Sequence, residues 1–234
     1  MNKKEILSYE TDASRIIGRA EKVVFPKKAE DIQNVVKNSD RDFVPRGGGT
    51  SQTGGTIPNN SIVIDMSKMN KILSFDPKKR IIEVEAGISL KELNEKLNSI
   101  NLEFPIKSLN ESSTIGGMAA INSPNSRSMK YGRIKNWIEE IEFVNGRGEL
   151  MKTSKADLGD VCGMEGITGI IVRLRIKVTK KIERSAGIFQ TDSLEEVLSM
   201  ARRLKLENDV IMLELFPPEV SEMLDFPKRY HLII

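Results

Sequence analysis

Cysteine and histidine are almost absent from this sequence, which has one of each among 234 residues. The single cysteine, Cys162, excludes a disulfide within the chain and any metal site built from several thiolates, and we interpret it as a buried, inert thiol. The single histidine, His231, lies in a strand-like run near the C-terminus, which favours a structural role over that of a catalytic base. We therefore expect no metal site.

Long apolar runs and an excess of one charge are also lacking. No segment reaches the roughly 18 uninterrupted apolar residues of a membrane-spanning helix, and Met1–Leu7 has two lysines without the apolar stretch of a signal peptide. Lys and Arg total 36 and Asp and Glu 33, with no basic stripe interleaved with aromatic residues. These absences predict a soluble, cytoplasmic protein that binds no nucleic acid.

The first part of the chain alternates strand-like and helical patterns. Val23–Phe25, Asp42–Pro45 and Ser61–Asp65 are short runs typical of strands, and Ala29–Asn38 carries apolar residues at helical spacing. The last of the three strands is apolar enough to be buried in a parallel sheet. Residues 1–68 are therefore predicted to form a small α/β lobe.

Residues 69–182 have a different pattern. Lys71–Asp76 and Arg80–Ala86 alternate like a hairpin, and longer strand-like runs follow at Glu139–Val144 and Ile170–Val178. The sequence predicts a second, larger lobe with a mostly antiparallel sheet, and the two lobes together form the main domain.

Residues 183–234 change pattern again. A helix is predicted over Ser193–Leu204, with strands at Val210–Phe216 and Tyr230–Ile234. We interpret this unit as the incomplete start of a C-terminal cap. Its last strand is expected to be an unpaired sheet edge, which invites pairing with another chain, and the helix face around Leu194 and Leu198 is expected to be exposed.

The strongest local signal is the loop Pro45–Gly55, which has five glycines in its last nine positions. Glycine loses more backbone entropy on folding than any other residue, so such a loop suits a place where successive N–H groups surround a phosphate. The loop has neither the Gly-Lys-Ser/Thr ending of a Walker A motif nor a G-x-G-x-x-G that opens a long helix. A flexible surface turn is the alternative interpretation.

Three further glycine-bearing segments follow, at Ser113–Gly117, Lys130–Gly132 and Gly163–Ile171. In this order and spacing the four segments resemble the FAD-binding domain of the vanillyl-alcohol oxidase/p-cresol methylhydroxylase superfamily, in particular the flavoprotein subunits of glycolate oxidase and D-lactate dehydrogenase. The resemblance covers roughly Lys22–Val178. It implies an α+β fold, namely a two-lobed FAD-binding domain over residues 1–182 followed by the start of a ferredoxin-like cap.

The resemblance also implies the residues that contact FAD. They are Pro45, Arg46, Gly47, Gly48, Gly49, Thr50, Ser51, Gly54, Gly55, Pro105, Ser108, Thr114, Ile115, Gly116, Gly117, Asn122, Tyr131, Gly132, Glu165, Gly166, Gly169, Ile170 and Ile171. Relatives that attach FAD through histidine place it at the position of Gly49, so the flavin is expected to bind non-covalently. The chain departs from the family pattern at Ile106–Lys107, Met118, Pro124–Asn125 and Asn136.

The implied function is an FAD-dependent oxidoreductase that oxidises a small 2-hydroxy acid such as glycolate or D-lactate. Relatives take the carboxylate-binding group and the base mainly from the C-terminal cap, so no catalytic residue is assigned, and Arg127 and Lys130 are candidates to stabilise negative charge on flavin or phosphate. Two alternatives stay open: a flavin-binding or electron-transfer subunit without activity of its own, and a degenerate relative that keeps the fold for assembly. Self-association, or a partner that completes the cap and accepts electrons, is expected.

Overall fold

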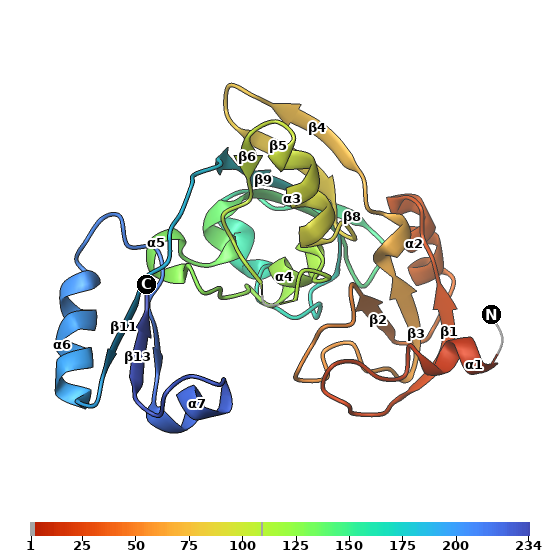
Figure 1. The fold of residues 1–234 in the computed structure, drawn as a ribbon. Helices are drawn as coiled ribbons and strands as arrows, with labels where there is room; N and C mark the ends of the chain where they lie inside the picture. The colour runs from red at the N-terminus through yellow and green to blue at the C-terminus, as the bar shows by residue number, and fades with distance from the viewer. Residues whose placement is uncertain (1–2, 109) are drawn as a thin grey trace.

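The sheet near the N-terminus is parallel, with strand order β1-β3-β2, in the computed structural model, which describes residues 3–108 and 110–234. Its elements are α1 (Lys3–Leu7), β1 (Arg19–Val24), α2 (Ala29–Lys37), β2 (Phe43–Arg46) and β3 (Asn59–Asp65). Residues Ser61–Asp65 are all buried, as expected for an apolar strand between two parallel neighbours. The predicted small α/β lobe is confirmed (Figure 1).

Helix α2 joins this lobe to the rest of the molecule. Ile32 and Val36 on its inner face belong to the same buried core as the larger lobe. On the same helix, the side-chain amide of Gln33 donates a hydrogen bond of 3.0 Å to the carbonyl of Gly148, in the turn of a distant hairpin. The two lobes therefore share one core rather than meeting at a loose interface.

The larger sheet is antiparallel, with strand order β4-β5-β9-β7-β8. Its strands are β4 (Ile72–Asp76), β5 (Ile81–Glu85), β7 (Ile138–Val144), β8 (Leu150–Lys152) and β9 (Ile170–Lys177). The predicted hairpin and both long strands are confirmed, and none of their ends moves by more than one residue. The residue at which one lobe gives way to the next stays a prediction.

Two helices lie over this sheet and are tied to each other at their starts. They are α3 (Leu90–Asn98) and α4 (Ile115–Ala120). The hydroxyl of Ser89 and the carboxylate of Glu92 form a capping box at the start of α3. Directly beside it, the N–H of Leu90 donates to the carbonyl of Ser113 at 2.9 Å, and the N–H of Ile115 donates to Ile88 at 2.9 Å. The second glycine segment is therefore fixed by the beginning of α3.

The remaining elements of this region are short. They are η1 (Met66–Lys68), β6 (Leu102–Glu103), α5 (Ser128–Tyr131), η2 (Ile134–Trp137), η3 (Asp157–Asp160) and β10 (Thr179–Lys180), and β6 pairs with β10. Among the helices that the structure describes, none combines the length and apolar character needed to cross a membrane.

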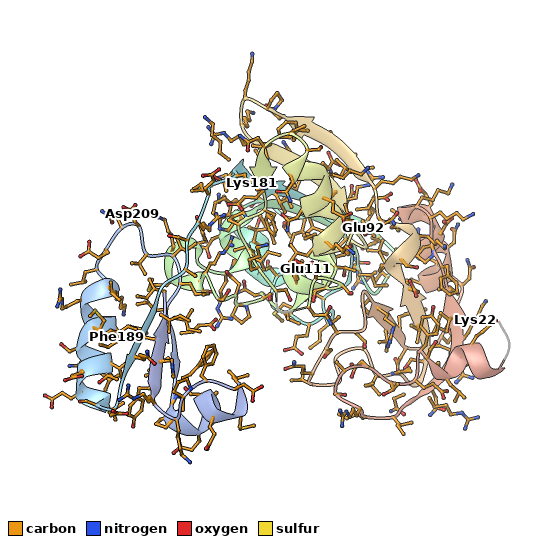
Figure 2. All side chains as sticks on the ribbon, viewed as in Figure 1. Lys22, Glu92, Glu111, Lys181, Phe189 and Asp209 are labelled. Atoms are coloured by element: carbon orange, nitrogen blue, oxygen red, sulfur yellow. The ribbon has the colours of Figure 1, made fainter. Side chains whose placement is uncertain are left out.

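A second three-stranded antiparallel sheet follows, with strand order β11-β13-β12. Its elements are β11 (Ile188–Thr191), α6 (Leu194–Leu204), β12 (Glu214–Phe216), α7 (Pro218–Met223) and β13 (Tyr230–Ile233). Figure 1 shows this sheet and the parallel sheet on opposite sides of the five-stranded sheet. In Figure 2, Lys181 marks where the chain leaves the larger lobe and Phe189 where it enters the new sheet.

The expectation that the last strand is an unpaired edge is wrong. β13 is the central strand and pairs with β11 and β12, so His231 and Leu232 are buried. Adjacent residues of a strand point to opposite faces, so the burial of both His231 and Leu232 shows that β13 is covered on both faces, which suits the apolar run at residues 230–234. The predicted exposure of Leu194 and Leu198 is confirmed, with exposed fractions of 46% and 36%.

Candidate functional site

The first glycine loop packs directly against the second glycine segment. A Cβ atom added to Gly48 would lie 2.2 Å from the carbonyl oxygen of Ser112, and one added to Gly47 would lie 2.2 Å from the hydroxyl of Thr114. Neither glycine has a positive φ, whereas Gly49 has a φ of 64°. Gly47 and Gly48 therefore have no room for a side chain, whereas Gly49 has a left-handed backbone that favours glycine.

A chain of hydroxyl groups continues this contact. The Thr50 hydroxyl lies 3.1 Å from that of Ser113, which lies 3.3 Å from that of Ser108. Two stretches far apart in the sequence, the loop at Thr50 and residues Ser108–Ser113, are thus joined by side chains that both donate and accept hydrogen bonds. Such a row of hydroxyls offers hydrogen bonds to a polar ligand that runs along it.

Several backbone N–H donors of the first loop have no hydrogen-bond acceptor among the described residues. Within the described part of the chain, the N–H groups of Gly47, Gly48, Gly49 and Thr50 have no acceptor. Unpaired successive N–H groups in a glycine loop form an anion-binding concavity, and the loop follows β2 at the carboxyl end of a parallel strand, where ligands of α/β sheets bind. The loop is thus suited to a phosphate group.

The N-terminal segment clamps this loop from outside, a contact for which the amino-acid pattern carries no signal. The N–H of Ala13 donates to the carbonyl of Gly49 at 3.2 Å, and Asp12 Oδ2 accepts the Thr56 hydroxyl at 2.9 Å. Burial alone would raise the pKa of Asp12, but hydrogen bonds from Ser14 and Thr56 outweigh it and hold the pKa below its ordinary value. Asp12 is therefore a charged hydrogen-bond acceptor that shapes the loop.

Arg46 belongs to the same clamp. Its guanidinium donates to the Ser8 carbonyl at 3.2 Å and to the Thr56 hydroxyl at 3.3 Å, and it lies 5.5 Å from the centre of the Tyr9 ring. These contacts hold the predicted FAD residue Arg46 against the N-terminal segment. Its direct contact with FAD stays a prediction.

The two glycines of the second segment, Gly116 and Gly117, are needed for different physical reasons. A Cβ added to Gly116 would lie 2.6 Å from the Cβ of Ala86, at the end of β5, so this glycine is needed for packing. Gly117 is exposed and meets only the Thr114 hydroxyl, at 3.1 Å. Because the N–H groups of Gly116 and Gly117 already have acceptors, the start of α4 offers open backbone surface at Gly117 rather than an anion site.

The fourth segment closes the site from the far end of α4. The N–H groups of Gly163 and Glu165 donate to the last carbonyls of α4 at 3.0 and 2.8 Å, and a Cβ on Gly166 would lie 3.2 Å from the ring of Pro45. Glu165, Gly166 and Pro45, three predicted FAD residues, are thus placed at one edge of the first loop.

One polar atom of this segment has no partner in the protein. The hydroxyl of Thr168 is buried and forms no hydrogen bond within the described residues. A buried unsatisfied hydroxyl is uncommon in a folded protein, and this one lies two residues from Gly166 in a segment that is predicted to contact FAD. Thr168 was missed from the sequence although it lies inside the motif.

The third segment is organised by asparagines. The side-chain amide of Asn125 donates to the carbonyl of Gly132 at 2.9 Å and its oxygen accepts the N–H of Arg127 at 2.9 Å. Asn136 Oδ1 accepts the N–H of Arg133 at 3.1 Å beside Gly132, which has a φ of 68°. Two of the departures from the family pattern therefore build the turn at Gly132.

Two other departures lie in the core. The side chains of Ile106 and Met118 are buried, with exposed fractions of 0% and 2%. The predicted FAD residues Ile115, Ile170 and Ile171 are buried in the same core. The departures at Ile106 and Met118 therefore change packing around the site. Contact of Ile115, Ile170 and Ile171 with FAD stays a prediction.

The other predicted residues are held by contacts within the protein. The side-chain oxygen of Asn122 accepts the N–H of Lys135 at 3.3 Å, and Asn122 lies beside Gly163. Tyr131 packs edge-on against Trp137, and Pro105 is buried. Gly169 lies against β7, and Ser51, Gly54 and Gly55 form a turn next to the N-terminal segment, where the N–H of Gly55 donates to the Ser51 hydroxyl at 2.9 Å. The turn at Ser51–Gly55 thus lies against the N-terminal segment, where a Cβ on Gly54 would meet the Ile16 side chain at 3.1 Å.

An ion cluster lies where the larger lobe meets the C-terminal sheet. Both terminal nitrogens of Arg184 donate to the carboxylate of Glu103, one of them at 3.0 Å. Arg127 Nη1 lies 3.9 Å from the same carboxylate, is buried, and has no hydrogen-bond partner among the described residues. Burial and the charge of Arg184 lower the pKa of Arg127. The predicted candidate Lys130 instead donates to the Asn208 carbonyl at 2.7 Å on the surface.

These observations fit FAD. The first loop offers free N–H groups to a phosphate, the hydroxyls of Ser108, Ser113 and Thr168 offer hydrogen bonds, and Gly117 leaves a flat backbone surface for a ring. The site has no reactive thiol, because burial raises the pKa of Cys162 to about 11. No group of three or more metal-ligating side chains was found in residues 3–108 and 110–234.

Replacing Gly48 with Ala tests the contact between the first two segments. We expect FAD affinity to fall by about tenfold to a hundredfold, because the new Cβ must displace the Ser112 backbone and overpacking of this kind costs about 1–3 kcal/mol. Equilibrium dialysis measures the affinity. Gly146→Ala is the control, since nothing lies within 4 Å of its Cβ position. Unchanged affinity in a folded Gly48→Ala variant would show that the loop is a simple turn.

Replacing Asp12 with Ala tests the N-terminal clamp. We expect FAD affinity to fall by about tenfold, because Thr56 and Ser14 lose a charged acceptor; the exposed Asp40→Ala is the control. Since the pKa of Asp12 lies below its ordinary value of 3.8, its contribution is present above that pH and is lost as the pH falls through the lowered pKa. A decline in affinity that begins near neutral pH and disappears in Asp12→Ala would contradict this.

Comparison with known proteins agrees with the geometry. The chain is 30% identical over 200 residues to D-lactate dehydrogenase of Archaeoglobus fulgidus (78% of this chain, 45% of the relative). It is 33% identical over 168 residues to D-2-hydroxyglutarate dehydrogenase of Haemophilus influenzae (68% and 16%) and 27% identical over 219 residues to glycolate oxidase subunit GlcD of Bacillus subtilis (88% and 45%). The chain spans less than half the length of these relatives.

The fold is shared with a solved structure. Alkyldihydroxyacetonephosphate synthase superposes with a TM-score of 0.79 over 90% of this chain and 47% of that one, at 21% sequence identity. Residues 20–154, more than half of the chain, match the FAD binding domain family. The chain therefore belongs to the FAD binding domain family, and FAD is its cofactor.

Proposed function

We propose that this chain is the flavin-binding part of an oxidoreductase that oxidises a small 2-hydroxy acid such as glycolate or D-lactate. The observation that supports this most is the wall formed by the first, second and fourth glycine segments, with four free N–H groups, because it suits a dinucleotide that lies along it. The bound flavin supplies the hydride acceptor, N5. The relatives named above are dehydrogenases or oxidases of D-lactate, D-2-hydroxyglutarate and glycolate.

The protein's own task in this proposal is to bind and orient. The first loop holds the pyrophosphate, Gly117 lets the backbone approach the ring, and Thr168 donates or accepts one hydrogen bond. The only histidine, His231, is buried in the C-terminal sheet against the Ser221 hydroxyl at 2.9 Å, so it is not placed to act as a base. The base that removes the hydroxyl proton is therefore proposed to lie outside this chain.

A second candidate function follows from the same observation about His231. A chain that binds FAD while its histidine is buried in the C-terminal sheet suits a flavin-binding or electron-transfer subunit. Either way we propose that another chain, or a second copy, completes the cap. β11 and β12 each pair on one side only within the described residues, and Ile188 and Leu215 on them are 55% and 37% exposed.

FAD is proposed to bind non-covalently, because Gly49 has no side chain to form a bond. Acid precipitation of the purified yellow protein is expected to release the flavin into the supernatant, where its absorbance is measured. A control with added free FAD fixes the recovery expected for an unattached cofactor. Yellow colour that stays in the pellet would contradict the proposal.

Anaerobic mixing with glycolate, D-lactate or D-2-hydroxyglutarate tests the reaction. We expect slow bleaching of the flavin by at least one acid, little or no catalytic dye reduction, and no bleaching by ethanol, which lacks a carboxylate. Light scattering on the same sample is expected to give a mass above that of the monomer. Absence of bleaching would favour the electron-transfer subunit, whereas a monomer with rapid dye reduction would show that the catalytic groups lie within this chain.

A further inference from the structure

Two guanidinium groups share one carboxylate at the border between the FAD-binding lobes and the C-terminal sheet. The Glu103 side chain is 8% exposed, that of Arg127 is 15% exposed and that of Arg184 is 21% exposed. The charges of the three side chains therefore sum to one positive charge in a largely buried place. Burying a charge without a close partner is unfavourable.

The two arginines are not equivalent. Arg184 binds Glu103 through both of its terminal nitrogens and also donates to the Ile182 carbonyl at 2.8 Å. Arg127 Nη1 reaches the same carboxylate only at 3.9 Å, beyond hydrogen-bonding distance, and has no other acceptor among the described residues. The unmatched positive charge thus lies on Arg127, whose Nη1 is buried although 15% of its side chain stays exposed.

The cluster lies beside the cofactor wall but away from the phosphate loop. Glu103 lies two residues before the segment Pro105–Ser108, and Arg127 lies at the start of α5, which ends in Tyr131 and Gly132. Both segments are assigned to FAD. Figure 1 shows α5 and the loop after β2 on opposite sides of α4. An anion bound at Arg127 is therefore not the pyrophosphate that the loop holds.

We propose that Arg127 binds the carboxylate of the acid substrate, an inference that rests on the proposed function. A guanidinium matches a planar carboxylate with two parallel hydrogen bonds, and Arg184 already binds the carboxylate of Glu103 in this way. Arg127 has the same chemistry and no such partner. The chain itself thus supplies one group of the carboxylate-binding site, while the base comes from elsewhere.

Calorimetric titration of the FAD-loaded chain with oxalate, an unreactive carboxylate, tests the proposal. We expect Arg127→Met to weaken oxalate binding by about tenfold to a hundredfold, the range for a lost charge-assisted hydrogen bond. Lys130→Met is the matched control, because it removes an exposed cation three residues away that binds the Asn208 carbonyl, and it should change the affinity less than about twofold. Equal oxalate affinity in the wild type and Arg127→Met, or no binding by the wild type, would overturn the proposal.

A second variant covers the case in which Arg127→Met does not fold, as judged by its FAD content and near-ultraviolet circular dichroism. Arg127→Lys keeps the charge but loses the paired donors, so severalfold weaker oxalate binding is expected, and unchanged affinity would overturn the proposal. Inorganic phosphate as competitor separates the anion sources: displacement of oxalate by equal concentrations of phosphate would show a general anion site and overturn the carboxylate assignment. Failure of the proposed function can be recognised separately. If oxalate binding depends on Arg127 but no hydroxy acid bleaches the flavin, the proposed function is rejected and the carboxylate site is retained.

Discussion

The close approach of two stretches of backbone determines the rest of this site. Gly47 and Gly48 lie so near Ser112 and Thr114 that neither has room for a Cβ. The parallel sheet supplies the first stretch at the end of β2, and the start of α3 fixes the second through hydrogen bonds at Leu90 and Ile88. The two lobes therefore have to be correctly packed on each other before the binding surface exists, which agrees with their shared core.

Much of the binding surface is backbone, and this explains how the chain departs from its family pattern without losing the site. The free N–H groups in the first loop and the open surface at Gly117 are main-chain features, most of them at glycines that the chain keeps, and none of the departures lies on them. Ile106 and Met118 differ from the family pattern but lie in the core, where volume matters more than chemistry. Asn125 and Asn136 differ too, and they hold the turn at Gly132 in place by their own hydrogen bonds.

The elements that were predicted correctly depend on local signals. Ser89 with Glu92 caps α3, the continuous apolar run before Asp65 marks a buried parallel strand, and the hairpin before Ala86 follows from alternation. The position of β13 was not predictable in this way. An apolar run looks the same at the edge and at the centre of a sheet, and only pairing with β11 and β12, distant in sequence, decides between them.

The same distinction applies to the site. The glycine segments can be found from the sequence because their order and spacing resemble those of a known family. The sequence does not distinguish Gly48, which has no room for a Cβ, from Gly49, which needs a positive φ. Asp12 carries no sequence signal, because it acts from the N-terminal segment. Thr168 lies inside the fourth glycine segment but is singled out only by a buried hydroxyl without a partner among the described residues. Such residues become visible when donors and acceptors are counted in three dimensions.

The ion cluster connects the larger lobe to the segment that leads into the C-terminal sheet. Arg184 lies on the connection between β10 and β11, and its carboxylate partner Glu103 lies on β6, two residues before Pro105, which is predicted to contact FAD. Because Glu103 is held by Arg184, it cannot fully neutralise Arg127, so the position of the connection decides how much positive charge Arg127 presents. A movement of the C-terminal sheet that loosened Arg184 would let Glu103 turn to Arg127 and remove the unmatched charge. The position of the C-terminal sheet and the proposed anion site therefore both depend on one ion pair.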